Sequence, residues 1–302
     1  MERLQRVTQF WNWIPAFRAV AETEHLPTAS KLLQVSPSAL SRSVHLIEKN
    51  LGTSLFKREG RRIRLTHAGE KFLSTVRDAI RLVDDGLSAV TGKALAGPVH
   101  LSVAGPIIRS ILPALRRLQK THSDLVFYLH SHPPRESNTL LLRGQLDVAF
   151  LTHPRLQEGL HVEALASATS GIYCGRGHPL FGSKRPTLEQ ILRYPFVEHI
   201  PGESEISLED WPPHVSRQVE MYVESMAVVV DVCASGQLLA ALPDPVARSY
   251  PQRGSLRRLP PAVMSPTTYH AVRRRTLAPR GLAEVVVEAV GRELRKRLLP
   301  CK

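Results

Sequence analysis

The chain has 302 residues, and 40 Lys and Arg side chains outnumber 27 Asp and Glu, so its formal net charge at pH 7 is +13. That length allows two or three domains with full cores, and the positive charge favours nucleic acid as a partner. There is no signal-peptide pattern and no apolar run long enough to span a membrane, so we expect a cytoplasmic protein without a membrane partner.

Two helices are predicted at the start of the chain. Apolar side chains recur at helical spacing in the first: Phe10, Ile14, Phe17, Val20 and Ala21. Pro15 lies inside that run, and we expect it in the first turn of the helix or just before it. In the second helix, Thr28 is the expected N-cap, and Ala29 is small enough for a close helix crossing.

A third helix is predicted from Ser36, because a serine cap followed by Pro37 is a strong helix start. At 100° per residue its apolar face consists of Leu40, Val44, Ile47 and Leu51. Its opposite face is short, hydroxylated and basic: Ser38, Ser41, Arg42, His45 and Lys49. Such side chains suit contacts with phosphates and base edges, although an ordinary amphipathic surface helix also has a polar face.

An arginine-rich hairpin follows this helix. Gly60 is the expected turn between two short extended runs, and it is followed by Arg61, Arg62 and Arg64. Arginines at a hairpin tip can enter the minor groove of DNA or bind phosphate, and the alternative is a solvated charged loop. Helix, turn, helix and hairpin together predict a winged helix-turn-helix.

The segment from Phe17 to Gly69 resembles the DNA-binding domain of the LysR-type transcriptional regulators. The resemblance rests on 29–33 (ASKLL), 35–36 (VS), 39–42 (ALSR), 47–48 (IE), 51–52 (LG), 55–58 (LFKR) and 65–69 (LTHAG). The family usually has Gln-Pro after the serine that opens the recognition helix, where this chain has Pro37-Ser38, so base-reading positions differ. The expected DNA-binding residues are Thr28, Ser36, Pro37, Ser38, Ser41, Arg42, His45, Lys49, Arg61, Arg62 and Arg64.

Residues 66–93 are predicted to form one long helix capped by Thr66. Its apolar residues alternate spacings of three and four, and we expect them to form a dimer seam: Leu73, Val76, Ile80, Val83, Leu87 and Val90. The alternative is that this stripe packs on its own domain. The resemblance implies the dimerising role and an assembly of two or four chains. Residues 94–98 (ALAGP) should break the helix and act as a hinge.

From residue 99 the pattern predicts an α/β domain. Strands are expected at 99–103, 125–129, 147–151, 170–174, 195–198, 217–223, 238–242 and 267–273. Helices are expected at 107–120, 135–143, 187–193, 204–210, 225–235 and 281–299. The resemblance implies a domain similar to a periplasmic binding protein, made of two α/β subdomains. The predicted divisions are 1–65 (winged helix-turn-helix), 66–95 (linker helix and hinge) and 96–302 (effector domain). Within the last, subdomain I is 96–166 with 268–302, and subdomain II is 167–267.

A small-molecule effector should lie near helix N-termini and the carboxyl ends of strands. The candidate residues are Ala104, Gly105, Pro106, Ile107, His132, Pro133, Gly202, Glu203 and Ser204. The glutamates of the last loop weakly favour a neutral or cationic ligand, or simply suit the first turn of a helix. His130 and His132 are interpreted as a solvated pair rather than a metal site, because no third ligand has a suitable spacing.

The resulting hypothesis is a DNA-binding transcriptional regulator whose second domain binds an effector and shifts the arrangement of the oligomer on DNA. Alternatives are a regulator whose second domain is vestigial or only oligomerises, and an enzyme anchored to DNA. No nucleophile elbow, phosphate loop or metal-binding cysteine spacing supports catalysis or a cofactor. Cys174 and Cys233 are expected to be small core residues, Cys301 is terminal, and a reactive cysteine pair is not expected.

Overall fold

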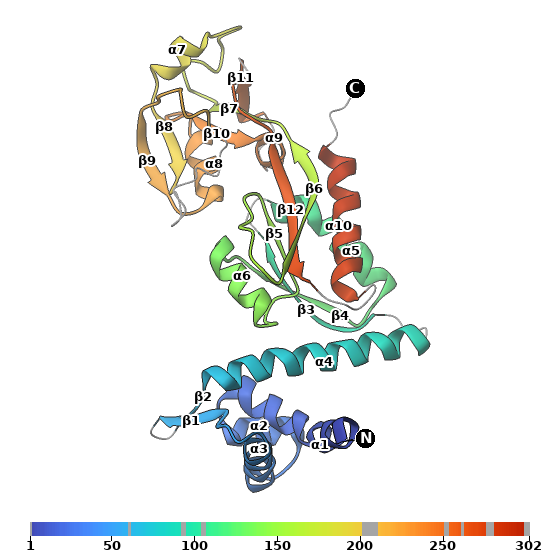
Figure 1. Ribbon diagram of the computed structural model, residues 1–302. Coiled ribbons are helices and arrows are strands. Elements are labelled where there is room, and N and C mark those ends of the chain that lie inside the picture. Colours follow the sequence, from blue (N-terminus) through green and yellow to red (C-terminus); the bar gives the residue numbers. More distant parts are fainter. Residues whose placement is uncertain are drawn as a thin grey trace. The chain divides into compact units, whose positions relative to one another are not determined.

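The computed structural model describes residues 2–59, 62–91, 95–103, 107–200, 211–250, 254–260, 263–275 and 281–298. It divides into two compact units (Figure 1): Met1–Lys93 with Leu142–Gly144, and Ala94–Leu141 with Gln145–Lys302. Within the described ranges, no helix combines the length and the apolar character that crossing a membrane requires. The subdomain divisions given above stay a prediction.

The first unit contains four helices and a hairpin in its described residues: α1 (Glu2–Thr23), α2 (Leu26–Leu33), α3 (Pro37–Leu51), β1 (Phe56–Glu59), β2 (Arg62–Leu65) and α4 (His67–Thr91). The α1 helix begins well before Pro15, which lies inside it. Pro15 is exposed, so water can solvate the carbonyl group that loses its hydrogen bond there. Proline therefore does not set the start of this helix.

The two short helices differ in how well their starts were predicted. The prediction of Ser36 as the N-cap of α3 is confirmed, since its Oγ accepts a hydrogen bond from the Ala39 amide at 3.2 Å. The prediction of Thr28 as the N-cap of α2 is wrong. The helix begins three residues earlier, with His25 as its N-cap, and the Thr28 hydroxyl lies 2.8 Å from His25 Nδ1. Pro27 suits the first turn and allows this earlier start.

The core of the first unit draws on α1, α3, α4 and the hairpin. Its central ring is Phe17, which is fully buried against Phe56 and Phe72, with ring centroids 5.6 and 4.8 Å away. The other buried members of this cluster are Ile14, Ala21, Ile47, Leu55, Leu73 and Val76. The prediction that the apolar face of α3 is buried is confirmed for Leu40, Val44 and Ile47. It is wrong for Leu51 in the last turn, which is exposed.

The dimer seam predicted along α4 needs a correction. Leu73 and Val76 are only 5% and 2% exposed, because they pack in the core of their own unit, and Ile80 contacts the same core. They are not available to a second helix. Val83 and Leu87 are 43% and 60% exposed, and for them the seam stays a prediction. The side chain of Val90 falls outside the described residues.

The second unit begins with a five-stranded sheet in the order β4-β3-β5-β12-β6. Its strands are β3 (Gly97–Val103), β4 (Leu125–His130), β5 (Val148–Leu151), β6 (Leu160–Ala168) and β12 (Thr267–Arg274). The helices α5 (Ile108–Thr121) and α10 (Leu282–Leu298) bury one face of the sheet, and α6 (Pro134–Leu142) lies on the opposite face (Figure 1). Alternation along β3 divides its residues between these faces, so that Val99, Leu101 and Val103 join the core under α5 and α10.

The rest of the second unit forms two smaller sheets, β10-β7-β11 and β8-β9. The elements are β7 (Ser170–Gly175), α7 (Leu188–Leu192), β8 (Phe196–His199), β9 (Val219–Val223), α8 (Met226–Ala234), β10 (Ala240–Pro243), α9 (Asp244–Arg248) and β11 (Leu256–Leu259). The chain passes between the sheets at Thr169 and again between β11 and β12. At these passages the buried hydroxyls of Ser170 and Thr267 lie 2.9 Å apart. The helix predicted at 204–210 lies outside the described residues.

The burial of Leu73 gives a first testable prediction. Leu73→Ala should destabilise the first unit by about 2–5 kcal/mol, because it removes buried methyl groups and leaves a cavity. Leu82→Ala, at an exposed position on the same helix, should change the stability by less than about 0.5 kcal/mol. Hydrogen exchange of the α1 and α3 amides localises the measurement to this unit. Equal effects of the two substitutions would contradict the assignment of Leu73 to the core.

Candidate nucleic-acid interface and effector site

The polar face of α3 is exposed to solvent. Ser38, Ser41, Arg42, His45 and Lys49 are all exposed, as the helical spacing predicted. Ser36 and Ser38 form a hydroxyl pair at 3.0 Å beside the exposed Pro37, at the helix start. The first half of α3 therefore presents hydroxyls together with Arg42, Lys49 lies in the last turn, and Thr28 of α2 is also exposed. This composition suits phosphate oxygens and base edges.

The inner face fixes the orientation of α3. Leu40 and Val44 pack against Ala19 and Val20 of α1 and against Ala29 of α2, which is completely buried. A larger side chain than Ala29 would push the two helices apart. Between the helices, Gln34 adopts a left-handed conformation at φ 54°, which makes the turn tight. The polar face is therefore held outward by packing on its opposite side.

Glu48 connects α3 to the hairpin, and its role was missed by the sequence analysis. Its Oε1 accepts hydrogen bonds from the amides of Leu55 and Phe56 at 2.8 and 3.0 Å. The single carboxylate of α3 thus points into the domain and away from the polar face. No spacing rule reveals this contact, because it depends on where the chain turns after the helix.

The hairpin is antiparallel, with Phe56 opposite Leu65 and Glu59 opposite Arg62. Arg64 forms an ion pair with Glu24 at 2.5 Å, so this arginine also ties the hairpin to the end of α1. Gly60 and Arg61 lie outside the described residues, and so does the side chain of Arg62. Their expected contacts with DNA stay a prediction.

The effector residues predicted from the sequence fall into three groups. Ala104, Gly105, Pro106, Gly202, Glu203 and Ser204 lie outside the described residues. Ile107 is 3% exposed and its side chain packs in the core under α5 and α10, and its assignment to the effector site stays a prediction. His132 and Pro133 follow the carboxyl end of β4, where ligands bind in sheets of this kind.

Two buried serines hold the segment that contains His132. Ser102 and Ser137 have hydroxyls 3.1 Å apart. The His132 amide donates to Ser102 Oγ at 3.3 Å, and Ser137 Oγ donates to the His132 carbonyl at 3.2 Å. The sequence analysis missed both serines, because they come from a strand and a helix that only the fold brings together.

The histidines near this segment do not form the solvated pair that was predicted. His130 is partly buried, and its ring stacks between those of His100 and His132 at centroid distances of 5.5 Å. Burial first, and then the neighbouring charges of His100 and His132, lower the pKa of His130. No group of three or more His, Cys, Asp or Glu with metal-binding geometry occurs in the described ranges.

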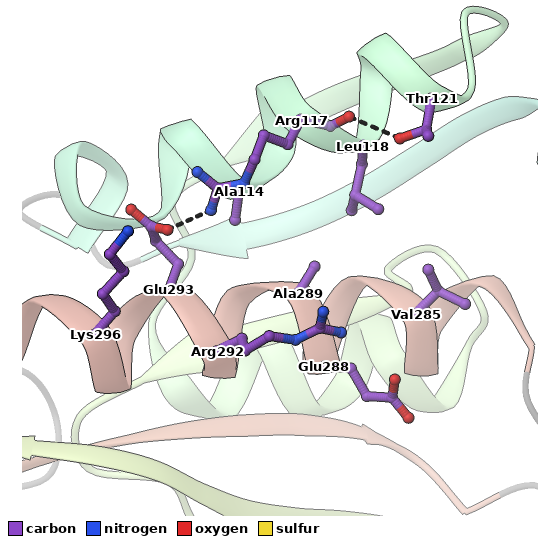
Figure 2. A pocket seen from close by; sticks show the side chains of 10 residues that line it. All are labelled: Ala114, Arg117, Leu118, Thr121, Val285, Glu288, Ala289, Arg292, Glu293 and Lys296. Atoms are coloured by element: carbon purple, nitrogen blue, oxygen red, sulfur yellow. Dashed lines mark hydrogen bonds and ion pairs between the residues drawn. The ribbon is translucent and has the colours of Figure 1, made fainter.

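A groove of about 340 Å³ lies between α5 and α10 (Figure 2). Its walls combine apolar and charged side chains: Ala114, Arg117, Leu118, Thr121, Val285, Glu288, Ala289, Arg292, Glu293 and Lys296. Burial opposes ionisation of Glu293, but hydrogen bonds from Arg297 and Arg117 outweigh it and hold the pKa of Glu293 below its usual range. Of the predicted effector residues that the structure describes, Ile107, His132 and Pro133, none lines this groove.

Comparison with known families decides the identity. Residues 11–70 match the family model described as "Bacterial regulatory helix-turn-helix protein, lysR family", and residues 92–295 match that of the "LysR substrate binding domain". The chain belongs to the LysR family. Both regions agree with the winged helix-turn-helix and the α/β domain described above, and the prediction from the sequence is confirmed at the level of family and fold.

Three similar proteins illustrate the relationship. The Escherichia coli (strain K12) regulator YnfL is 28% identical over 185 residues, which are 60% of this chain and 62% of that relative, so less than two thirds of YnfL is matched. A Mycobacterium leprae protein named "Probable hydrogen peroxide-inducible genes activator" is 24% identical over 299 residues, 94% of this chain and 95% of the relative. The structure of a full-length OxyR variant from Pseudomonas aeruginosa superposes with a TM-score of 0.73 at 19% identity, covering 94% of this chain and 93% of that one. Such low identity supports the fold alone.

The described cysteines of this LysR protein lack the properties of redox-active thiols. Cys174 and Cys233 are completely buried and free, as predicted for core residues. Burial raises the pKa of Cys174 to about 11 and that of Cys233 to about 12. Because the thiolate is the reactive form, both side chains should be inert in the folded protein.

This conclusion can be checked with a thiol reagent. In a Cys301→Ser chain, which retains only Cys174 and Cys233, a chromogenic disulfide should react within seconds after unfolding in guanidinium. In native buffer it should react only at the rate of unfolding. Rapid labelling of the native chain at mildly alkaline pH would contradict the burial and the raised pKa values.

Proposed function

We propose that this chain is a DNA-binding transcriptional regulator, acting in the cytoplasm, that reads double-stranded operator DNA with α3 and responds to a small-molecule effector bound by its second unit. The observation that carries the proposal is the outer face of α3. It is exposed, hydroxylated and cationic, while its inner face is locked into the core and its carboxylate, Glu48, is directed into the hairpin.

The charge of the first unit supports the same proposal. Residues 1–93 contain 15 Lys and Arg and 9 Asp and Glu, so this unit is more basic per residue than the remainder of the chain. Several acidic groups of the unit are already paired with its own arginines, as Glu24 is with Arg64 and Glu22 with Arg18. Repulsion of DNA phosphates by these carboxylates is thereby reduced.

A footprint on the DNA upstream of the gene tests the proposal. At stated salt concentration and with excess competitor DNA, the protein should protect two half-sites in phase on the double helix. If protection is lost on addition of competitor DNA, the interaction is non-specific electrostatic attraction. That result would contradict operator recognition.

Arg42→Ala should weaken binding to that site by about 1–3 kcal/mol, because the guanidinium is replaced where it faces DNA. The thermal midpoint should stay the same, since Arg42 is exposed. Arg193→Ala removes an equal charge from an exposed ion pair in the second unit and should leave affinity nearly unchanged. Equal affinity of the Arg42→Ala and wild-type chains would contradict the assignment of this face to DNA.

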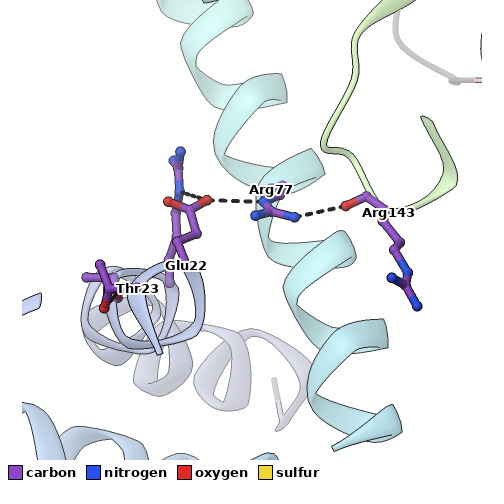
Figure 3. Close-up of polar contacts among 6 residues, drawn as sticks. Glu22, Thr23, Arg77 and Arg143 are labelled. Atoms are coloured by element: carbon purple, nitrogen blue, oxygen red, sulfur yellow. Dashed lines mark hydrogen bonds and ion pairs between the residues drawn. The ribbon is translucent and has the colours of Figure 1, made fainter. Parts of the chain in front are cut away.

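The proposal includes self-association through α4. The first turns of α4 are fixed to α1, because Glu22 Oε1 accepts from Arg77 Nε at 3.1 Å (Figure 3), and because Leu73 and Val76 are buried. Farther along, Val83 and Leu87 expose apolar surface on a helix that continues to Thr91. A helix attached in this way would set the spacing of two DNA-reading units in a homodimer or homotetramer.

Replacing Val83 and Leu87 together with Glu should give smaller species in sedimentation, because charge would be buried at the helix pair. The unfolding midpoint of the monomeric unit should hardly change, as both positions are exposed. Glu at Leu32 of α2, which is 66% exposed, is the control. An unchanged oligomer would contradict the proposed seam.

Effector binding is proposed for the side of the five-stranded sheet where β3 and β4 end. The support is the match to the LysR substrate binding domain and the placement of His132 by Ser102 and Ser137. A screen of metabolites by thermal shift tests it, since a ligand that binds the native state stabilises it by RT ln(1 + [L]/Kd). A hit must also change the footprint to count as an effector.

A further inference from the structure

Four aromatic rings form a continuous stack on the face of the five-stranded sheet that carries α6. Tyr128 lies on His100 at a centroid distance of 4.7 Å and an interplanar angle of 11°. His130 follows at 5.5 Å and 14°, and His132 at 5.5 Å and 23°. The parallel register of β3 and β4, with His100 opposite Tyr128 and Ser102 opposite His130, brings these residues together.

One hydrogen bond inside the stack limits how many protons it can hold. His100 Nδ1 and His130 Nε2 are 3.2 Å apart. Such a bond needs one nitrogen that carries hydrogen and one with a free lone pair. If both imidazoles are protonated, both nitrogens are donors, the bond is lost and two positive charges face each other. The closed stack therefore requires one of these rings to be neutral.

Two carboxylates and a tyrosine ring surround the stack. At one end, His132 Nδ1 lies 3.1 Å from Glu136 Oε1 in the first turn of α6. At the other end, His100 lies over the Tyr128 ring, and its amide donates to the Asp147 carboxylate at 2.7 Å. His130 lies between two histidines, and burial first and then these neighbours lower its pKa, so His130 is the ring for which the neutral form is favoured.

We propose that this histidine stack is a proton-responsive switch of the effector domain, closed while His130 is neutral and opened when His130 takes up a proton and the hydrogen bond to His100 is lost. When the stack opens, the ring of His132 separates from the ring of His130. Since His132 is bonded through its backbone to Ser102 and Ser137, the change reaches the buried hydroxyl pair and the start of α6. The further step, that the switch alters the response to effector and DNA, rests on the proposed function.

The direction of the pH effect follows from the lowered pKa of His130. The unfolded chain takes up this proton near pH 6.5, before the folded chain does, so protonation favours unfolding. The stabilisation by neutral His130 is complete above that pH and is lost progressively as the pH falls below it. Stability of the second unit should therefore decrease on mild acidification.

The first test is an NMR titration of the full-length chain with labelled imidazoles, the His130 signal being assigned from its absence in His130→Gln. His130 should change its chemical shift at a pH clearly below 6.5, and the His100 and His132 signals should respond in the same step. Titration of His130 at or above pH 6.5, independent of its neighbours, would overturn the proposal. This measurement needs only the wild-type fold.

The second test compares thermal midpoints between about pH 7.5 and about pH 5.5, the range in which histidine changes charge. His130→Phe keeps a flat ring in the stack but removes the proton site, so its midpoint should fall less on acidification than that of the wild type. His214→Phe, at an exposed histidine outside the stack, should keep the wild-type pH dependence. Equal pH dependence of all three chains would overturn the proposal.

Neither test involves DNA or effector. A result that contradicts the switch therefore leaves the proposed function untouched, and the reverse also holds. Absence of a specific footprint at any pH would contradict DNA recognition and leave the titration result standing. A footprint whose pH dependence is smaller in His130→Phe than in His214→Phe would support coupling of the switch to DNA binding. The same pH dependence in both variants would exclude that coupling.

Discussion

The burial of one face of α3 is the constraint on which the rest of the DNA-binding unit depends. Leu40, Val44 and Ile47 are removed from water by α1 and α2 on one side and by the hairpin and α4 on the other. Rotation of the helix would expose these side chains at a cost of about 1.5–3 kcal/mol each. The polar face is therefore fixed toward solvent, and Glu48 holds the hairpin beside it.

Helical periodicity predicted α3 well, because its cap, its apolar face and its polar face all follow from local spacing. The same reasoning failed on α4. Spacing shows that Leu73 and Val76 share a stripe with Val83 and Leu87, but it does not show which partner covers each part. Here the unit's own core covers the first half of the stripe and leaves the second half exposed. The start of α2 was misplaced for a related reason, since Thr28 contacts His25 from inside the helix.

In the second unit, the alternation of strands and helices was recognisable, whereas the contacts between them were not. β6, β11 and α9 were not predicted, and neither was the packing of Ile107 in the core. The histidine stack could not be foreseen, because it depends on the parallel register that places His100 opposite Tyr128. Local spacing showed only that His130 and His132 alternate. Partial burial and ring contacts, which local spacing does not show, distinguish them from a simple solvated pair.

The central proposal is that the outer face of α3 reads operator DNA, and tethered cleavage tests it most directly. A Ser41→Cys, Cys301→Ser chain, in which the two remaining cysteines are buried, would carry an iron chelate at Ser41 in the middle of that face. The account predicts two clusters of strand cleavage inside the protected region, separated by whole turns of about 10–10.5 base pairs. Cleavage spread evenly along the duplex, or confined to its flanks, would contradict the account.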